Sequence, residues 1–403
     1  MKNGSHPIVT VLDCGRAFDT CRFSTLFGRL LEKGVPAIVV RTMMTVYEEQ
    51  YAWVSWGREK SELFPILNGT RQGSVASPAL WSIYCDPLIQ ELRKLGVGAH
   101  VGGLFMGVTM YADDLLLIAP TRGAMQQMLQ VCEDYATKYN ICFSIDPIPS
   151  KSKSKCIFMV GNNKNMMKPV PLMLAGQELP WVETATHLGH ELHQSGSMEH
   201  DAKVKRAEFI DKSVETRETF KFASPVEVLH AIKVYCSSLY GCMLWDLAGV
   251  GACQVFNAWN MATKLTWDCP RETRTYLVQQ VLSCGLTTAK TDVLVRYSKF
   301  FHSLRSSTSK EVATMANLVS RDVQTTTGAN LRLIERETGL SAWDTSQDKL
   351  KDTVVQKEVV PVEESEQWRI PFLNKLLSRK QELLYLGEDT EDISGLINSL
   401  CIN

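Results

Sequence analysis

The sequence predicts an α+β domain, an antiparallel sheet with packed helices, followed by an α-helical region. Up to about Glu199, short runs rich in β-branched and aromatic residues alternate with segments of helical periodicity. Beyond that residue the strand signals disappear and helical patterns continue. We therefore divide the chain into residues 1–198, a helical region at 199–350, and an acidic linker with a terminal helix at 351–403.

Composition narrows the class of protein further. The chain has 403 residues, of which 45% are hydrophobic, and its formal net charge is -1, which fits a globular protein of a few domains. A strongly charged partner would therefore have to bind a local patch of charged residues. Twelve dispersed cysteines are typical of a protein from a reducing compartment. The sequence shows neither a signal peptide nor an apolar span long enough to cross a membrane. We therefore expect an intracellular protein, in the nucleus or the cytoplasm.

The first part of the domain shows strand, helix and hairpin signals in turn. A β-branched run ends directly before Asp13, and leucines at helical spacing follow it. Aromatic alternation then returns, and a Gly-containing loop comes after it. The expected elements are a strand at 7–12, helices ending at Gly34 and spanning 36–49, a hairpin over 51–56 and 63–67, and a loop at 68–73.

A long helix and a second hairpin are predicted next. Ser77 followed by Pro78 is typical of an N-cap and first turn, and leucines at three- and four-residue intervals lead to Gly96, with a kink expected at Pro87. Two apolar strands, 104–110 and 115–119, are separated only by Tyr111, Ala112, Asp113 and Asp114. This pattern indicates a hairpin with two carboxylates at its tip.

The remaining patterns are mainly helical. The predicted elements are an amphipathic helix at 121–140, strands at 141–145 and 157–160, helices at 202–222 and 225–247, and a terminal helix at 371–386.

Three carboxylates stand at strand ends in this prediction. If the first strand lies beside the hairpin, neighbouring strands are about 4.8 Å apart and Asp13 meets Asp113 at one edge. Such a cluster repels itself unless divalent cations neutralise it, and hard carboxylate oxygens suit Mg²⁺ or Mn²⁺. Two ions of this kind can hold the oxygens of an in-line phosphoryl transfer. On the dipeptide alone, an ordinary turn is the alternative.

The motifs resemble those of the reverse transcriptases of non-LTR retrotransposons (LINE-type), in the same order. They are V-T-V-L-D-C-G-R-A-F-D at 9–19, N-G-T-R-Q-G-S-V-A-S-P-A-L at 68–80, M-Y-A-D-D-L-L-L-I-A at 110–119, K-S-K-S-K-C-I-F at 151–158 and H-L-G at 187–189. The resemblance covers about residues 5–195 and extends weakly to S-S-L-Y-G-C-M-L-W at 237–245. It implies a polymerase palm followed by a thumb-like region.

This resemblance implies a role for each matching residue. Two Mg²⁺ ions, or Mn²⁺ in their place, would be held by Asp13, Asp113 and Asp114, with the catalytic Lys153, or else Lys155, near the leaving pyrophosphate. The residues implied in nucleotide binding are Phe18, Arg71, Gln72, Gly73 and Tyr111. Those implied in contacts with primer or other nucleic acid are Lys151, Lys155, His187, Leu188 and Gly189. The implied partners are an RNA template, a DNA primer and deoxynucleoside triphosphates, with no membrane.

Several alternatives stay open at this point. Phe18 could instead be a core residue, and the lysines of 151–168 could form a solvated loop. Arg16 stands where the family usually has Lys. The family also carries a fingers region before its first palm motif, whereas Asp13 lies close to Met1, so we expect missing fingers and weak activity of this chain alone. The rival functions are a catalytically inactive, retrotransposon-derived nucleic-acid-binding protein and a group II intron maturase.

Overall fold

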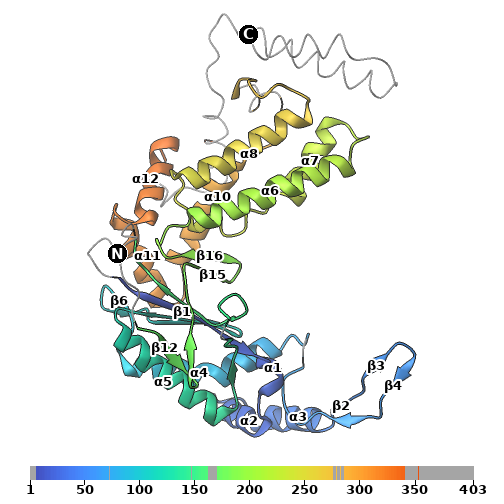
Figure 1. Cartoon of the computed structure of the whole chain (residues 1–403), viewed down its shortest axis with the longest axis vertical. Helices are drawn as coiled ribbons and strands as arrows, with labels where there is room; N and C mark the ends of the chain where they lie inside the picture. Colours follow the sequence, from blue (N-terminus) through green and yellow to red (C-terminus); the bar gives the residue numbers. More distant parts are fainter. Residues whose placement is uncertain are drawn as a thin grey trace, which may run out of the picture. The chain divides into compact units, whose positions relative to one another are not determined.

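The computed structural model describes residues 6–71, 73–146, 148–161, 170–275 and 286–340, together with residues 278, 282 and 353 (Figure 1). The chain divides into two compact units, Met1–Ser197 and Met198–Asn403. Apart from Thr353, the linker and terminal helix predicted after residue 351 lie outside the described residues. The names palm, thumb and linker remain predictions.

The first unit is built on a six-stranded sheet with the order β14-β11-β1-β9-β8, in which β10 also pairs with β1. Its neighbouring strands are antiparallel, except that β14 runs parallel to β11. The α+β fold class is therefore confirmed. The strands are β1 (Ile8–Gly15), β8 (Val108–Tyr111), β9 (Asp114–Ala119), β10 (Cys142–Phe143), β11 (Lys155–Phe158) and β14 (Trp181–Val182).

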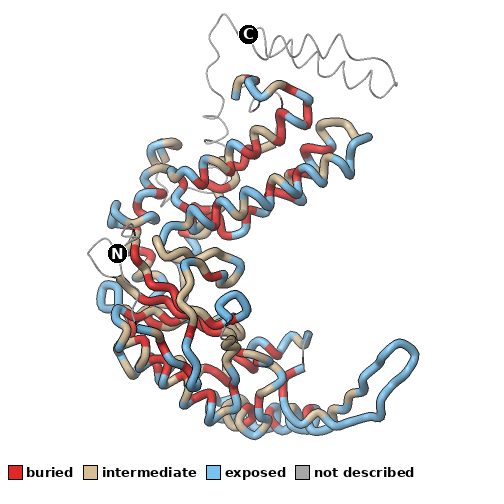
Figure 2. Tube along the Cα trace, in the orientation of Figure 1, coloured by how far each residue is buried: buried red, intermediate tan, exposed pale blue. Residues whose placement is uncertain are grey.

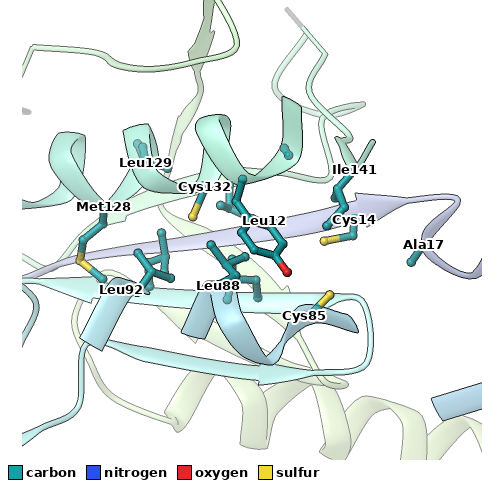
Figure 3. Close-up of a cluster of buried hydrophobic side chains, with 14 of the residues drawn as sticks. Leu12, Cys14, Ala17, Cys85, Leu88, Leu92, Met128, Leu129, Cys132 and Ile141 are labelled. Carbon is teal, nitrogen blue, oxygen red and sulfur yellow. The ribbon is translucent and has the colours of Figure 1, made fainter. Parts of the chain in front are cut away.

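Helices cover one face of this sheet. The helices of the unit are α1 (Ala17–Thr20), α2 (Phe23–Glu32), α3 (Ala37–Glu48), α4 (Ser77–Leu95) and α5 (Arg122–Tyr139). Leu12 and Cys14 of β1 join a buried cluster with Leu88 of α4 and with Leu129 and Cys132 of α5 (Figure 3). The buried residues accordingly follow the sheet and the inner stripes of the helices (Figure 2).

Side chains alternate along β1, and this alternation decides where Asp13 points. Val9 and Val11 belong to a second, smaller cluster with Ile157 and Ala185. Because successive side chains of a strand point to opposite faces, Asp13 lies on the face of Val9 and Val11, away from the helix-packed core. Ala185 belongs to β15 (Thr184–His187), which pairs with β16 (His190–His193) on this second face.

The loops of the first unit form short hairpins. β2 (Tyr51–Ala52) pairs with β5 (Phe64–Pro65), and β3 (Ser55–Trp56) pairs with β4 (Glu59–Lys60), so the predicted hairpin is present as a projecting ribbon (Figure 1). Two further hairpins join β6 (His100–Val101) to β7 (Leu104–Phe105) and β12 (Leu172–Leu174) to β13 (Gln177–Leu179).

Two sequence predictions in this unit were wrong in detail. The strand expected over 104–110 is interrupted between β7 and β8. At this break the amide of Met106 donates to the carbonyl of Ala99 (2.8 Å). Ser77 does not cap α4 but is its first residue, and its hydroxyl donates to the carbonyl of Arg71 (2.5 Å).

Within its described residues, the second unit is α-helical, as predicted. Its elements are α6 (Glu199–Thr219), α7 (Pro225–Tyr235), the short 3₁₀ helix η1 (Cys242–Leu244), α8 (Val250–Thr266), α10 (Ala289–Arg305), α11 (Lys310–Arg321) and α12 (Thr326–Thr338). The helix predicted over 225–247 was too long, since α7 ends at Tyr235 and positive φ angles at Leu239 (39°) and Gly241 (81°) turn the chain. No helix in the described parts of the chain is long and apolar enough to cross a membrane.

Candidate active site

The carboxylates predicted to meet at one sheet edge do so through β1 and the β8–β9 hairpin. Asp13 of β1 is the register partner of Asp114 of β9, and Tyr111 pairs with Asp114 across the hairpin. Ala112 and Asp113 therefore form the two-residue tip of the hairpin. The structure thus places Asp113 next to the Asp13–Asp114 pair.

The tip of this hairpin is held from two sides. The indole N–H of the buried Trp81 donates to the carbonyl of Ala112 (2.7 Å), and Ala112 has a positive φ of 50°. The amide of Cys14 donates to the carbonyl of Asp113 (3.0 Å). Both bonds join the hairpin backbone to other elements, so the position of the carboxylates is set by α4 and β1.

Like charges and burial disturb the ionisation of this site. The pKa of the Asp114 carboxyl is raised, first because burial removes it from water and then because Asp113 and Asp13 repel its charge. His187 and Lys153 act on it in the opposite direction. Burial also lowers the pKa of His187, while Asp114 favours its protonated form. The site is therefore an acidic cluster with two basic groups within electrostatic range.

One side chain of the lysine motif, that of Lys153, lies next to the acidic cluster. Lys153 Nζ lies 3.6 Å from Asp13 Oδ1, with the Lys153 side chain 70% exposed and that of Asp13 17% exposed. Lys151 is also exposed, and Lys155 is half-buried at the start of β11. Lys151 and Lys153 are therefore solvated, as in the alternative interpretation, and Lys153 also pairs with Asp13.

The serines between these lysines were missed by the sequence reasoning. Ser152 and Ser154 are buried, and the Asp13 amide donates to Ser154 Oγ (3.2 Å). The signal available in the sequence was the strict alternation of K-S-K-S-K, which predicts that serines and lysines face opposite sides.

Phe18 packs beside the support of the hairpin. It is half-buried at the edge of the core, and its ring centroid is 6.1 Å from that of Trp81. The backbone of Phe18 also holds the next motif, because its carbonyl accepts from the amide of Thr70 (2.6 Å). A Cβ at Gly69 would meet that carbonyl oxygen at 2.8 Å, which explains a glycine there.

The other implied nucleotide contacts lie on exposed backbone. Arg71 and Gly73 are exposed in the loop before α4, and Gly73 has a φ of 79°, which favours glycine. Tyr111 is exposed at the end of β8. Gln72 lies outside the described residues.

The H-L-G motif forms a tight hairpin between β15 and β16. Leu188 (φ 49°) and Gly189 (φ 76°) are its two turn residues, and His187 pairs with His190 across it. Two consecutive positive φ angles are typical of a type I′ turn, which suits the twist of a two-residue hairpin. His187 is the residue of this motif whose charge interacts with Asp114.

The three aspartates suit hard divalent cations by the chemistry of their oxygens, but not by their spacing. No group of three or more His, Cys, Asp or Glu side chains among the described residues is gathered closely enough to hold a metal ion. The chemistry of the cluster nevertheless suits one, because carboxylate oxygens are the preferred ligands of Mg²⁺ and Mn²⁺ and a cation would relieve the repulsion that raises the pKa of Asp114.

The similarity to a known protein family lies in the first unit. Residues 1–192 match the family described as reverse transcriptase (RNA-dependent DNA polymerase), whose members generally use divalent metal ions. The chain is similar to the Pol polyprotein of the type-2 retrotransposable element R2DM of Drosophila melanogaster, with 30% identity over 151 residues (36% of this chain, 14% of the relative). It is also similar to the R2 Pol polyprotein of Nasonia vitripennis, with 25% identity over 184 residues (45% and 17%).

Two more distant similarities complete the comparison. A putative 115 kDa protein of the element R1DM of Drosophila melanogaster is 25% identical over 187 residues (45% of this chain, 16% of the relative). A solved structure of telomerase from Candida albicans with a fragment of telomeric RNA has a TM-score of 0.40 and 9% identity, covering 94% of this chain and 50% of that one. The match spans 14% to 17% of the length of the three retrotransposon relatives.

Proposed function

We propose that the domain at residues 1–192 synthesises DNA on an RNA template. This domain matches the reverse transcriptase family and has relatives among the Pol proteins of R2 and R1 non-LTR retrotransposons. The observation that supports this proposal best is the pairing of Asp13 with Asp114, beside Asp113, on the face of the sheet away from the core. An acidic cluster at strand ends suits two-metal nucleotidyl transfer.

In this proposal the three aspartates would hold two divalent cations, Mg²⁺ with Mn²⁺ as a substitute. The cations supply charge for the attacking and leaving oxygens when bound. The primer 3′-hydroxyl oxygen forms a bond to the α-phosphorus of a deoxynucleoside triphosphate, and the bond from that phosphorus to the bridging oxygen breaks. The electron pair leaves with pyrophosphate, and the hydroxyl proton passes to solvent water.

Lys153 would serve the leaving group in this reaction. Its ammonium lies beside Asp13 and is largely exposed, so it can reach an anion next to the cluster. A cation there stabilises the charge that develops on pyrophosphate and can donate a proton to it.

The remaining motif residues would bind substrates. Phe18, supported by Trp81, would form the wall beside the sugar, and the loop with Arg71, Gln72 and Gly73 would approach the nucleotide together with Tyr111. Lys151 and Lys155 would contact a nucleic-acid backbone. The hairpin of His187, Leu188 and Gly189 would contact the primer, and His187 lies within electrostatic range of Asp114.

The two rival functions are a group II intron maturase and a catalytically inactive nucleic-acid-binding protein. The relatives are proteins of retrotransposable elements, which favours a retrotransposon reverse transcriptase over a group II intron maturase. A catalytically inactive nucleic-acid-binding protein differs from the proposal only in chemistry, so it is an outcome of the experiment.

The experiment is primer extension on an RNA template with Mg²⁺ or Mn²⁺, together with Mn²⁺ binding measured by electron paramagnetic resonance. Asp113→Ala should reduce synthesis by about 10³-fold or more, because it removes a metal ligand. Asp134→Ala changes an exposed aspartate on α5 of the same unit and should leave the rate unchanged.

Synthesis that survives both Asp13→Ala and Asp113→Ala would contradict the proposed site. A chain that binds an RNA–DNA duplex, shows no Mn²⁺ affinity that depends on Asp13 and makes no DNA would be the inactive nucleic-acid-binding protein.

A further inference from the structure

We infer that Ser154 is a positioning residue for Asp13. Its buried hydroxyl replaces a strand carbonyl as the acceptor for the Asp13 amide and so holds the carboxylate in register with Asp114. The inference rests on the proposed function in one respect, namely that Asp13 is a metal ligand.

The need for such a residue arises from the sheet itself. Along one edge, β1 pairs with β11 from Ile8 to Val11, and at Cys14 and Gly15 it pairs with β10 instead. Asp13 lies at this change of partner. The backbone of a strand must still satisfy its polar groups there, because an unpaired amide at a part-buried position is costly.

Ser154 fills this gap with its side chain. The Asp13 amide donates to Ser154 Oγ (3.2 Å), and the carbonyl of Asp13 accepts from the amide of Ser144 (2.9 Å). The amide of Ser154 in turn donates to the carbonyl of Ser144 (2.9 Å). The three residues therefore form a closed ring of hydrogen bonds, in which each amide donates to the next residue.

Ser154 is the buried member of this ring, and it is supported in turn. Ser154 has an exposed fraction of 0%, and its carbonyl accepts from the hydroxyl of Ser152 (2.6 Å). A Cβ at Gly15 would meet Ser144 Oγ at 2.8 Å, so the glycine after Cys14 leaves room for the ring.

The ring acts on Asp13 at the same place as the lysine motif. Lys153 pairs with the carboxylate of Asp13, and the next residue accepts from its amide. On the opposite edge of β1, the amide of Cys14 donates to the carbonyl of Asp113. Both edges of the strand end are therefore fixed, which holds one carboxylate against the others with the precision that metal ligation and in-line transfer need.

The test uses Ser154→Ala with Ser152→Ala as its matched control. Both changes remove a buried hydroxyl from the same segment, but the Ser152 hydroxyl donates to Ser154 and not to Asp13. Mn²⁺ affinity is measured by electron paramagnetic resonance in the nucleotide-free chain, and amide hydrogen exchange is followed over residues 11–15. Both variants should lower the melting temperature.

Only Ser154→Ala should weaken Mn²⁺ binding, by about 10-fold, and speed exchange over residues 11–15. Ser154→Thr keeps the acceptor oxygen and should restore the affinity. If Ser154→Ala does not fold, Ser154→Cys keeps the size of the side chain with a weak acceptor, and the same loss is expected.

The outcomes separate this inference from the proposed function. If Asp13→Ala abolishes Mn²⁺ binding while Ser154→Ala or Ser154→Cys leaves it unchanged, Ser154 does not position Asp13 and the proposed function stands. If Asp13→Ala leaves Mn²⁺ binding unchanged, Asp13 is not a ligand, and both the proposed site and this inference are wrong.

Discussion

The two units of the chain treat charged groups in opposite ways. In the second unit, the fully buried Asp201 accepts from the indole N–H of Trp245 (2.8 Å), and Lys233 pairs with Asp292. In the first unit, Asp114 faces Asp13 and lies beside Asp113, so carboxylates of like charge are held together.

Under the proposed function, this difference separates charged groups that support the fold from charged groups that bind a metal ion. A hydrogen-bonding partner offsets the desolvation free energy of a buried charged group. Neighbouring groups of like charge instead raise the free energy of the folded chain unless a cation binds between them. The main-chain bonds of β1 and the hairpin keep the carboxylates together despite their repulsion. Four substitutions test this contrast.

The largest effect is expected from Trp245→Ala in the second unit. The indole is 1% exposed and binds Asp201, so its removal leaves a cavity and a buried carboxylate without this donor. The free energy of unfolding of this unit should fall by about 3–5 kcal/mol. Urea denaturation followed by circular dichroism measures it, with Phe222→Ala, at an exposed phenylalanine, as the control. A loss no greater than that of the control would show that this buried pair does not support the fold.

The same substitution at two lysines gives the second test. Lys233→Met removes the cationic partner of Asp292, which keeps its hydrogen bond from Thr287, and both side chains of the ion pair are mostly buried, so a loss of about 1–3 kcal/mol is expected. Lys153→Met removes an exposed pairing with Asp13, and the metal-free chain should change by less than about 0.5 kcal/mol. Both values come from urea denaturation without metal. Equal losses at the two sites would remove the contrast between the units.

The smallest effect is expected from Asp113→Asn. Burial and the neighbouring carboxylates raise the folded-state pKa of Asp114, so the folded chain binds that proton more tightly and loses stability as the pH rises through the raised pKa. Removing the charge of Asp113 should therefore raise the melting temperature of the metal-free chain at pH 7, by up to about 3 °C.

This gain should shrink at acidic pH, where the carboxyls of the parent are already protonated, and it should vanish when Mn²⁺ is bound. Asp134→Asn on α5 is the control. A melting temperature that falls at pH 7, or a gain of the same size at every pH, would show that repulsion at this cluster does not limit stability.

Local sequence determined the elements that lie within one short stretch of chain. The β8–β9 hairpin with its two aspartates was predicted from apolar runs on both sides of a short polar break. The bounds of α5 were also predicted, because Thr121 caps its start by accepting from the Ala124 amide (3.1 Å) and Asn140 ends it with a φ of 59°. These features depend on hydrogen bonds between residues close in sequence, so a local pattern is sufficient to specify them.

Only the tertiary structure decided how Asp13 is held. Its amide finds an acceptor in Ser154, and its carbonyl a donor in Ser144, because β1 changes partner strands at that residue. The chain just after the early end of α7 is likewise held by a distant residue, since the guanidinium of Arg296 in α10 donates to the carbonyls of Ser237 and Ser238. A buried backbone amide or carbonyl must form a hydrogen bond, but many residues distant in sequence can provide the partner. The sequence therefore requires a hydrogen bond at this position, and the packing of strands far apart in the chain selects the residue that forms it.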